Sequence, residues 1–262
     1  MEAVLENAVQ LDKPVVLIVD GIDHIARVLS EARFISSAET DIVDQLATLR
    51  IPSGVALIVG SQPGAHLAPL REAIGDQIMQ REVLPWGASE ISELSRRLGV
   101  EIALKKAANR DPDVVLLFLA ERSEGNPLYA TYLSRELKAG LELGTIADVE
   151  EWLSGVPVIR GDIARYYTYL YRHASKMTQD IADVLGVIDF GVSVADLREI
   201  VHSPRQDWVP EALKHLSPIL TAISSQGGVR IFHESFRRFI MNKLTQQGRS
   251  VTNALEPVIA WL

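Results

Sequence analysis

Residues 14–24 read Pro-Val-Val-Leu-Ile-Val-Asp-Gly-Ile-Asp-His, and this stretch decides the fold that we expect. Its apolar run, Val15 to Val19, predicts a strand buried on both faces. Two carboxylates follow, Asp20 and Asp23, with Gly21 between them to turn the chain. In open α/β sheets, ligands bind beyond the carboxyl ends of the strands. There one aspartate can hold Mg²⁺ and a second can orient an attacking water, although the same pattern also fits a plain turn.

A second apolar strand is predicted at Val55–Val59. Residues 40–49, between the two strands, carry apolar side chains at helical spacing, so strand, helix and strand predict a parallel βαβ unit. The second strand ends in the sequence Gly-Ser-Gln-Pro-Gly at residues 60–64. Ser61 and Gln62 should therefore lie at the same sheet edge as the two aspartates. They can contact a terminal phosphate there, or simply form a Pro-Gly turn.

Residues 86–156 are predicted to form a helical subdomain. Ser89 is expected to cap one of its helices and Asp111 the next, which is apolar nearly all round and therefore expected to be buried. Asn126-Pro127 should begin a further helix that ends before Gly140. The Gly-Asn-Pro sequence at this corner is first of all a signal that stops one helix and starts another.

Residues 157–247 have the pattern of a winged-helix domain. Amphipathic helices are predicted at about 162–174, 178–188 and 193–202, and a fourth from Pro210. A hairpin then joins Leu220–Ser224 to Val229–Phe232, and a last helix packs through Phe236, Phe239, Ile240 and Leu244. We expect residues 248–262 to begin a linker or a following domain.

The composition limits the class of protein. Of the 262 residues, 47% are hydrophobic and 23% are charged, which suits a chain with a packed core. The absence of cysteine excludes disulfides and thiolate metal sites and fits a cytoplasmic protein. No apolar run approaches the roughly 18 residues of a membrane helix, so no membrane partner is expected. The net charge of −8 argues against nucleic acid as a partner.

Four motifs in this order resemble the STAND class of signal-transducing NTPases, the NACHT and NB-ARC-like relatives of the AAA+ proteins. The resemblance covers about residues 10–245. Residues 15–23 resemble the Walker B strand, and residues 55–63 resemble the sensor-1 strand. Residues 125–127 resemble the Gly-x-Pro motif of the helical subdomain, whose proline packs on the nucleotide base. Residues 232–236 resemble the winged-helix histidine motif, whose histidine reaches the β-phosphate of ADP.

The resemblance implies a fold and a set of sites. The fold would be α/β: the C-terminal half of a parallel-sheet, P-loop-type NTPase core over residues 1–85, then the helical subdomain and the winged-helix domain. The implied cofactors are ATP or ADP with Mg²⁺. Asp20 would hold the metal and act in catalysis together with Asp23. The implied nucleotide contacts are Ser61, Gln62, Pro127 and His233.

Two departures from the family pattern change what we expect. Gln62 stands where many relatives carry arginine, which leaves a neutral amide contact to phosphate. The pattern Gly-x-x-x-x-Gly-Lys-Ser/Thr, which supplies most phosphate affinity in the family, does not occur in the sequence. We therefore expect this chain to be a piece of a longer protein and to be inactive alone as an ATPase.

The function implied by the resemblance is an ADP/ATP-operated switch that controls oligomerisation and effector activation. Its partners would be further copies of itself, with effector and sensor domains in the same polypeptide, in antiphage defence or another stress response. One alternative is a DNA-binding regulator, but the helix from Pro210 to Leu216 offers only Lys214 as a cation, beside Glu211. Another is a non-catalytic scaffold that keeps the fold.

Two further alternatives concern single residues. Without the motif around it, His233 on an apolar hairpin fits a core histidine as well as a nucleotide ligand. Arg237 and Arg238 are expected to form a solvated face.

Overall fold

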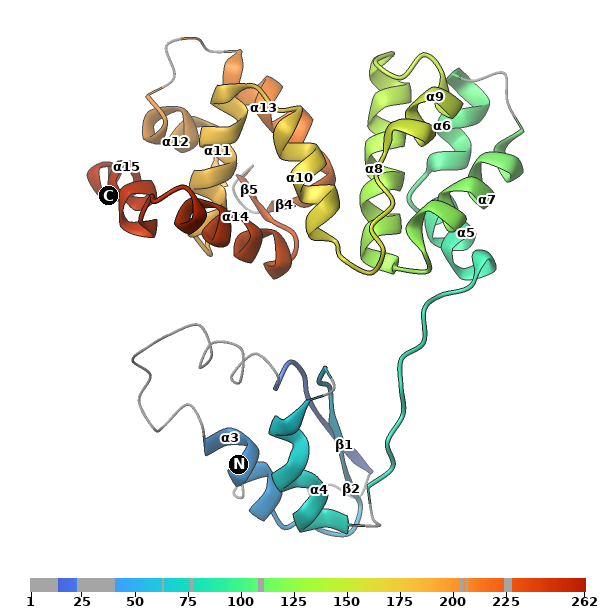
Figure 1. Ribbon diagram of the computed structural model, residues 1–262, viewed down its shortest axis with the longest axis vertical. Coiled ribbons are helices and arrows are strands. Elements are labelled where there is room, and N and C mark those ends of the chain that lie inside the picture. Colours follow the sequence, from blue (N-terminus) through green and yellow to red (C-terminus); the bar gives the residue numbers. More distant parts are fainter. Residues whose placement is uncertain are drawn as a thin grey trace. The chain divides into compact units, whose positions relative to one another are not determined.

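A computed structural model describes residues 14–22, 41–62, 64–75, 78–107, 111–202, 205, 207–223 and 228–262. Asp23, named above as a catalytic candidate, lies outside the described residues. The chain divides into two compact units, Met1–Val83 and Leu84–Leu262, and each is described by itself (Figure 1). The described chain is a mixture of α and β structure in which helices predominate. Among its helices none has the length and apolar character needed to cross a membrane.

Unit 1, Met1–Val83, is built on a parallel strand pair. Strands β1 (Val15–Val19) and β2 (Val55–Val59) pair in register from Val15 with Val55 to Val19 with Val59. Helix α3 (Asp41–Thr48) lies between them in sequence. A short 3₁₀ turn, η1 (Ala65–Leu67), and helix α4 (Ala68–Ile74) follow β2. The predicted order of strand, helix and parallel strand is confirmed.

One face of this strand pair carries the core of unit 1. Leu46 of α3 and Leu70 of α4 are buried against alternate residues of the strands. On the other face Val16, Ile18 and Ile58 are 55%, 67% and 53% exposed. The expectation that the first strand is buried on both faces is therefore wrong, because within the described residues both helices of this cluster pack on the same side.

The first part of unit 2, Leu84–Leu262, is a group of helices. These are α5 (Ala88–Arg97), α6 (Val100–Ala107), α7 (Pro112–Ser123), α8 (Pro127–Leu143) and α9 (Val149–Gly155). In this group α5, α6 and α7 pack on α8, and α9 packs on α7. Asp111 caps α7 as predicted, since its carboxylate accepts from the backbone N–H of Asp113 at 3.0 Å. Ser89 does not cap α5, because the helix already begins at Ala88, after Gly87.

Two other expectations for these helices are wrong. Helix α8 runs through Gly140 and ends at Leu143, and its capping residue, Gly144, takes the left-handed conformation (φ 69°) that glycine adopts without strain. Helix α7 is not buried all round. Leu116 is fully buried, but Leu117 and Phe118 are 59% and 47% exposed, because α5 and α8 pack on one side of α7.

The second part of unit 2 surrounds a small antiparallel sheet. Its helices are α10 (Ala164–Arg172), α11 (Lys176–Val187), α12 (Val194–Ile200), α13 (Trp208–Leu216) and α14 (Glu234–Gln246). Its strands are β3 (Val192–Ser193), β4 (Leu220–Ile223) and β5 (Gly228–Ile231), in the order β3-β5-β4. The predicted hairpin and closing helix are confirmed, and β3 is an additional strand.

Helix α15 (Val251–Trp261) packs onto α11 and α12 through buried Ala254 and Val258. The guanidinium of Arg249 pairs at 2.7 Å with the buried carboxylate of Asp183 on α11. The last residues of the chain therefore belong to the core of unit 2. Most of that core is one cluster of buried side chains that runs from α6 to α15, and a smaller cluster of Ile91, Ala120 and Ala130 lies between α5, α7 and α8.

Candidate functional site

The predicted site residues fall into two groups, one in each unit. In unit 1, the loops that follow β1 and β2 are joined by backbone hydrogen bonds. Gly60 N–H donates to the carbonyl of Val19 at 2.8 Å, and the Gly60 carbonyl accepts from Gly21 N–H at 2.9 Å. These bonds bring Asp20 and Ser61 to the same edge of the strand pair, one and two residues after the ends of β1 and β2.

Gly60 lets the Asp20 carboxylate approach the backbone of the second loop. A Cβ atom at residue 60 would collide with Oδ1 of Asp20. Because glycine has no side chain, the exposed carboxylate of Asp20 can lie directly against this loop. The colliding atom is the free end of an exposed side chain, so a larger residue at position 60 would displace the Asp20 carboxylate rather than the backbone.

A histidine that the sequence reasoning did not use also belongs to this edge. His66, in η1, places Nε2 2.7 Å from the Ser61 hydroxyl. That hydroxyl also lies 2.9 Å from the backbone carbonyl of Gln62, whose side chain is exposed. The signal in the sequence is the separation of five residues between Ser61 and His66, with Pro-Gly between them.

The edge thus presents a carboxylate, a hydroxyl, an amide and an imidazole. The described residues contain no group of three or more His, Asp or Glu side chains placed to hold a metal ion. Mg²⁺ held by Asp20 would therefore take its other ligands from water and phosphate oxygens. This is the usual arrangement for Mg²⁺, because the ion dehydrates reluctantly.

The second group lies in unit 2 and begins at the corner between α7 and α8. Glu124 and Gly125 both take left-handed conformations, with φ of 54° and 71°. The Asn126 side chain caps α8 by accepting from Tyr129 N–H at 3.0 Å, and Pro127 occupies the first turn with its ring exposed. The corner therefore stops one helix and starts the next, as the sequence indicates.

This corner is fixed on two sides. Trp86 N–H donates to the Gly125 carbonyl at 2.9 Å, and a Cβ on Gly125 would lie 2.6 Å from the Trp86 carbonyl oxygen. The Glu124 carboxylate accepts from the backbone N–H groups of Arg160 and Gly161 at 2.8 and 3.1 Å. The position of Pro127 is thus set by segments that precede α5 and α10.

His233 lies at the junction of β5 and α14. It is exposed, and its Nδ1 caps α14 by accepting from the backbone N–H of Ser235 at 3.2 Å. The core-histidine alternative is therefore wrong. The expectation of a solvated arginine face is also wrong for Arg237, which is 23% exposed and pairs with Glu234 at 3.1 Å.

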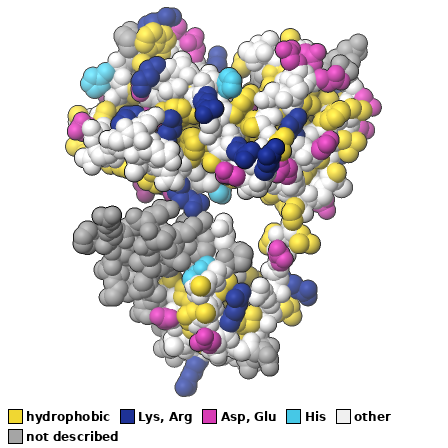
Figure 2. Space-filling view, viewed as in Figure 1, with side chains coloured by type: hydrophobic (Ala, Val, Ile, Leu, Met, Phe, Trp, Pro, Cys, Tyr) yellow, Lys and Arg dark blue, Asp and Glu magenta, His cyan; other side chains and the backbone are white. Residues whose placement is uncertain are grey.

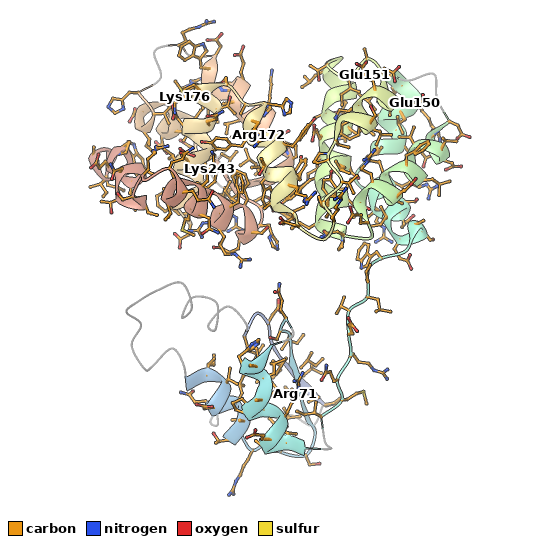
Figure 3. All side chains as sticks on the ribbon, in the orientation of Figure 1. Arg71, Glu150, Glu151, Arg172, Lys176 and Lys243 are labelled. Atoms are coloured by element: carbon orange, nitrogen blue, oxygen red, sulfur yellow. The ribbon has the colours of Figure 1, made fainter. Side chains whose placement is uncertain are left out.

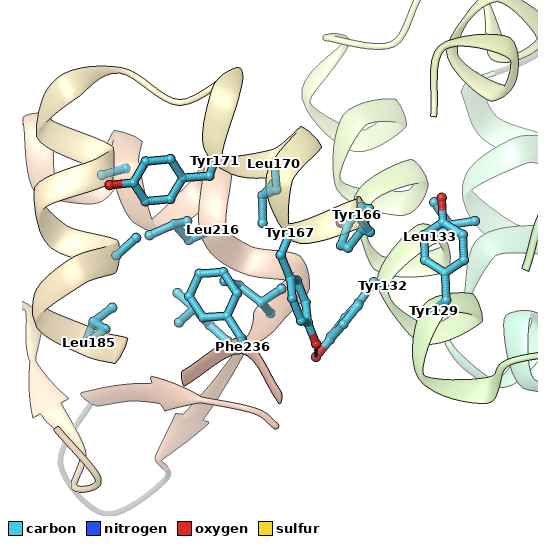
Figure 4. Packing of buried hydrophobic residues seen from close by; sticks show 14 of the residues in the cluster. Tyr129, Tyr132, Leu133, Tyr166, Tyr167, Leu170, Tyr171, Leu185, Leu216 and Phe236 are labelled. Carbon is cyan, nitrogen blue, oxygen red and sulfur yellow. Dashed lines mark hydrogen bonds between the residues drawn. The ribbon is translucent and has the colours of Figure 1, made fainter. Parts of the chain in front are cut away.

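All six tyrosines of the chain lie on α8 and α10, and Figure 4 labels five of them. Tyr132 stacks on Tyr166 with ring centroids 5.5 Å apart, and Tyr129 contacts Tyr166 at 5.2 Å. Tyr167 meets Phe236 of α14 edge-on at 5.1 Å. These rings join the two parts of unit 2. At the far end of α10, the ammonium of Lys243 (Figure 3) lies 4.3 Å from the centre of the Tyr171 ring.

A half-buried carboxylate is held among these rings. Glu136 of α8 accepts from the Tyr166 hydroxyl at 2.8 Å and from the indole N–H of Trp152 at 3.2 Å. Burial raises the pKa of Glu136, and these two donors oppose that shift. Burial also raises the pKa of Tyr166, and it raises the pKa of Tyr169 to about 12.

A path of hydrogen bonds joins His233 to α8. The hydroxyls of Tyr132 and Tyr167 are 3.2 Å apart, and the Tyr167 hydroxyl lies 2.5 Å from Ser235 Oγ. Ser235 Oγ in turn lies 2.8 Å from Nδ1 of His233. We call these four residues the hydroxyl chain. Its last member, Tyr132, is on the helix whose first residue is Pro127.

A second contact joins α8 to the hairpin. The guanidinium of Arg135 lies 4.5 Å from the centre of the Phe232 ring and donates to the carbonyls of Pro218 and Leu220. The hydroxyl chain and this cation–π contact both escaped the sequence reasoning. The available signals were Tyr129 and Tyr132 one turn apart in α8 and four tyrosines within residues 166–171.

Basic and acidic side chains are interspersed on the face of unit 2 that Figure 2 shows. No protein-family model matches the chain, and no curated protein matches it.

Proposed function

We propose that this chain is the switch module of a nucleotide-operated, STAND-like signalling protein. The observation that carries the proposal is the hydroxyl chain, which links the exposed His233 to the helix that begins at Pro127. These are the two positions in unit 2 that the motif resemblance assigns to the nucleotide. A phosphate contact at His233 and a base contact at Pro127 would therefore be mechanically coupled.

The topology of unit 2 supports the winged-helix part of the proposal. The order α11, β3, α12, α13, β4, β5, with β5 central in the sheet, is the order of a winged-helix domain. His233 then follows the second strand of the wing. A histidine there can donate to an anionic phosphate oxygen, and such charge-assisted bonds are stronger than neutral ones.

Unit 1 would contribute the metal and phosphate contacts. In this proposal Asp20 holds Mg²⁺, while Ser61, Gln62 and His66 face the terminal phosphate. Asp23 would orient water. Exchange of ADP for ATP would change the His233 contact and release the winged helix for self-association. For this to happen, ADP must bind the closed state more tightly than the open state, because a ligand shifts a conformational equilibrium only by the difference in its affinities for the two states.

The test is an ADP titration of the protein with His233→Ala. Losing a hydrogen bond to a charged group costs about 1.5–3 kcal/mol, so ADP affinity should fall about tenfold to hundredfold. Calorimetry measures the affinity, and mass photometry on the same samples should show more oligomer. The matched control is His173→Ala, which removes another exposed imidazole of unit 2 and should change neither quantity.

Two outcomes would contradict the proposal. The first is that the unmodified protein, with Mg²⁺ present, does not bind ADP at all. The second is that His233→Ala, still folded, keeps the original ADP affinity and oligomer fraction. DNA binding is not favoured as an alternative, since on α13 Lys214 lies beside Glu211 and the His215 ring is held 3.0 Å from the Leu170 carbonyl.

A further inference from the structure

We propose that Tyr167 is a positioning residue for His233. Through the hydroxyl chain it holds the neutral imidazole in the tautomer that carries hydrogen on Nε2. The inference rests on the proposed function only for the identity of the anion that this nitrogen would meet. The tautomer itself follows from contacts within unit 2.

The argument starts at Nδ1 of His233. The backbone N–H of Ser235 points at this nitrogen from 3.2 Å, and a backbone amide can only donate. Nδ1 must therefore present its lone pair, and the neutral ring carries its hydrogen on Nε2. Ser235 Oγ, 2.8 Å from the same Nδ1, must then also act as a donor.

The direction of each remaining bond follows from the one before it. Because Ser235 has given its only hydroxyl hydrogen to the imidazole, its oxygen is the acceptor toward Tyr167, 2.5 Å away. Tyr167 therefore donates to Ser235, and its oxygen accepts from Tyr132 at 3.2 Å. Every hydroxyl hydrogen in the chain points toward His233 (Figure 4 shows the Tyr132–Tyr167 bond).

Burial makes this orientation costly to reverse. Tyr132 and Tyr167 are both fully buried, so water does not compete for their hydroxyls. If Nδ1 carried the hydrogen, it would face the Ser235 N–H, and the capping bond of α14 would be lost. Ser235 would have to donate to Tyr167 instead, and both tyrosine hydroxyls would have to turn. A hydrogen-bonded chain in a low-dielectric interior resists such a reversal as a unit.

The consequence is a fixed donor at the exposed end of the chain. An Nε2–H group suits an anionic oxygen, such as that of a phosphate, whereas the other tautomer would present a lone pair. At the opposite end, Tyr132 belongs to α8. A change at the imidazole is therefore communicated to α8 through hydroxyl groups that each have one donor hydrogen.

The experiment is nitrogen-15 NMR of the imidazole rings in the whole chain at about pH 8, where an unperturbed histidine is neutral. The signal of His233 is identified by its loss in His233→Gln. In the unmodified protein we expect hydrogen predominantly on Nε2. Ser235→Ala should lower the ratio of the two tautomers about two- to twelvefold, the range for one neutral hydrogen bond. Tyr167→Phe should shift it in the same direction by a smaller factor.

The matched control is Tyr169→Phe, which removes one tyrosine hydroxyl from α10 outside the hydroxyl chain. It should leave the His233 signal unchanged. Tyr132→Phe removes the far end of the chain and leaves Tyr167 in place, so it keeps the test open if Tyr167→Phe does not fold. Its shift should be smaller than that of Ser235→Ala. A merely structural role for Tyr167 would lower the melting temperature without moving the tautomer ratio.

The inference is overturned if the unmodified protein carries the hydrogen on Nδ1. It is also overturned if folded Tyr167→Phe, or Tyr132→Phe in its place, has the tautomer ratio of the unmodified protein. An ADP titration of the same samples separates the two proposals. If the tautomers behave as expected but ADP does not bind, the proposed function fails and the positioning role stands. If ADP binds and the tautomer ratio is insensitive to Tyr167, the positioning role fails and the proposed function stands.

Discussion

At the scale of single residues, the most consequential group that the sequence reasoning overlooked is Glu136. A carboxylate among tyrosine rings is costly to ionise, because burial penalises its charged form. Its two donors, Tyr166 and Trp152, come from α10 and α9, so this one side chain ties both helices to α8. Its position in the middle of α8 gives no hint of that role in the sequence, since which face of a helix is covered depends on tertiary packing.

The raised pKa of Glu136 predicts a pH-dependent stability. In the folded state the carboxyl group binds its proton more tightly than in the unfolded chain, so folding is favoured at low pH and loses this contribution as pH rises through the folded-state pKa. We expect Glu136→Gln to gain in free energy of unfolding, relative to the unmodified protein, as pH rises above about 4.5. Urea denaturation at a series of pH values measures this.

Glu142→Gln, an exposed site on the same helix, is the control for that measurement. Because this side chain is exposed, its replacement should bring no comparable gain in the free energy of unfolding. Equal pH profiles for Glu136→Gln and Glu142→Gln would show that the Glu136 carboxyl has no special affinity for its proton.

At the scale of elements, the sequence predicted what depends on local spacing and missed what depends on partners. Helix α7 and its cap at Asp111 follow from the sequence, and so do the pairing of β1 with β2 and the hairpin of β4 and β5. Strand β3 has only two residues, too few for an alternating pattern. The end of α8 was placed too early because Gly140 reads as a stop. In the structure, the lack of a Cβ there instead makes room for Ile146.

The corner between α7 and α8 gives a test with a built-in control. Gly125 and Gly144 have nearly the same left-handed φ, 71° and 69°, but a Cβ on Gly125 would collide with Pro85 and Trp86, whereas nothing lies within 4 Å of one on Gly144. Both alanine variants should lose about 1–2 kcal/mol of the free energy of unfolding, because alanine is strained in the left-handed conformation. Gly125→Ala should lose more, and thermal or urea unfolding measures the difference. Equal losses of stability in the two variants would mean that Pro85 and Trp86 do not restrict the side chain at position 125.

At the scale of the whole molecule, the candidate sites were predictable only in part. The sharing of one edge by Asp20 and Ser61 follows from parallel pairing, because the carboxyl ends of parallel strands meet. The placement of His66 beside Ser61 depends on the geometry of a turn. The hydroxyl chain depends on how α8, α10 and α14 pack, which no local pattern encodes. Among the described residues the two units also differ in their cores: unit 1 contributes few fully buried side chains, and unit 2 contributes many.

The confinement of all six tyrosines to α8 and α10 makes the protein its own optical probe. Burial raises the pKa of every one of them, so the phenols should stay un-ionised beyond about pH 10 while unit 2 is folded. The folded state then holds more protons than the unfolded chain, and its stability must fall as pH rises. As pH is raised, the near-ultraviolet absorbance of phenolate should therefore appear over a narrow pH range, together with the loss of the helical circular dichroism signal. A gradual rise centred near pH 10 with helices intact would contradict this. Because no tyrosine lies elsewhere, the phenolate absorbance of the entire chain reports the opening of a single junction.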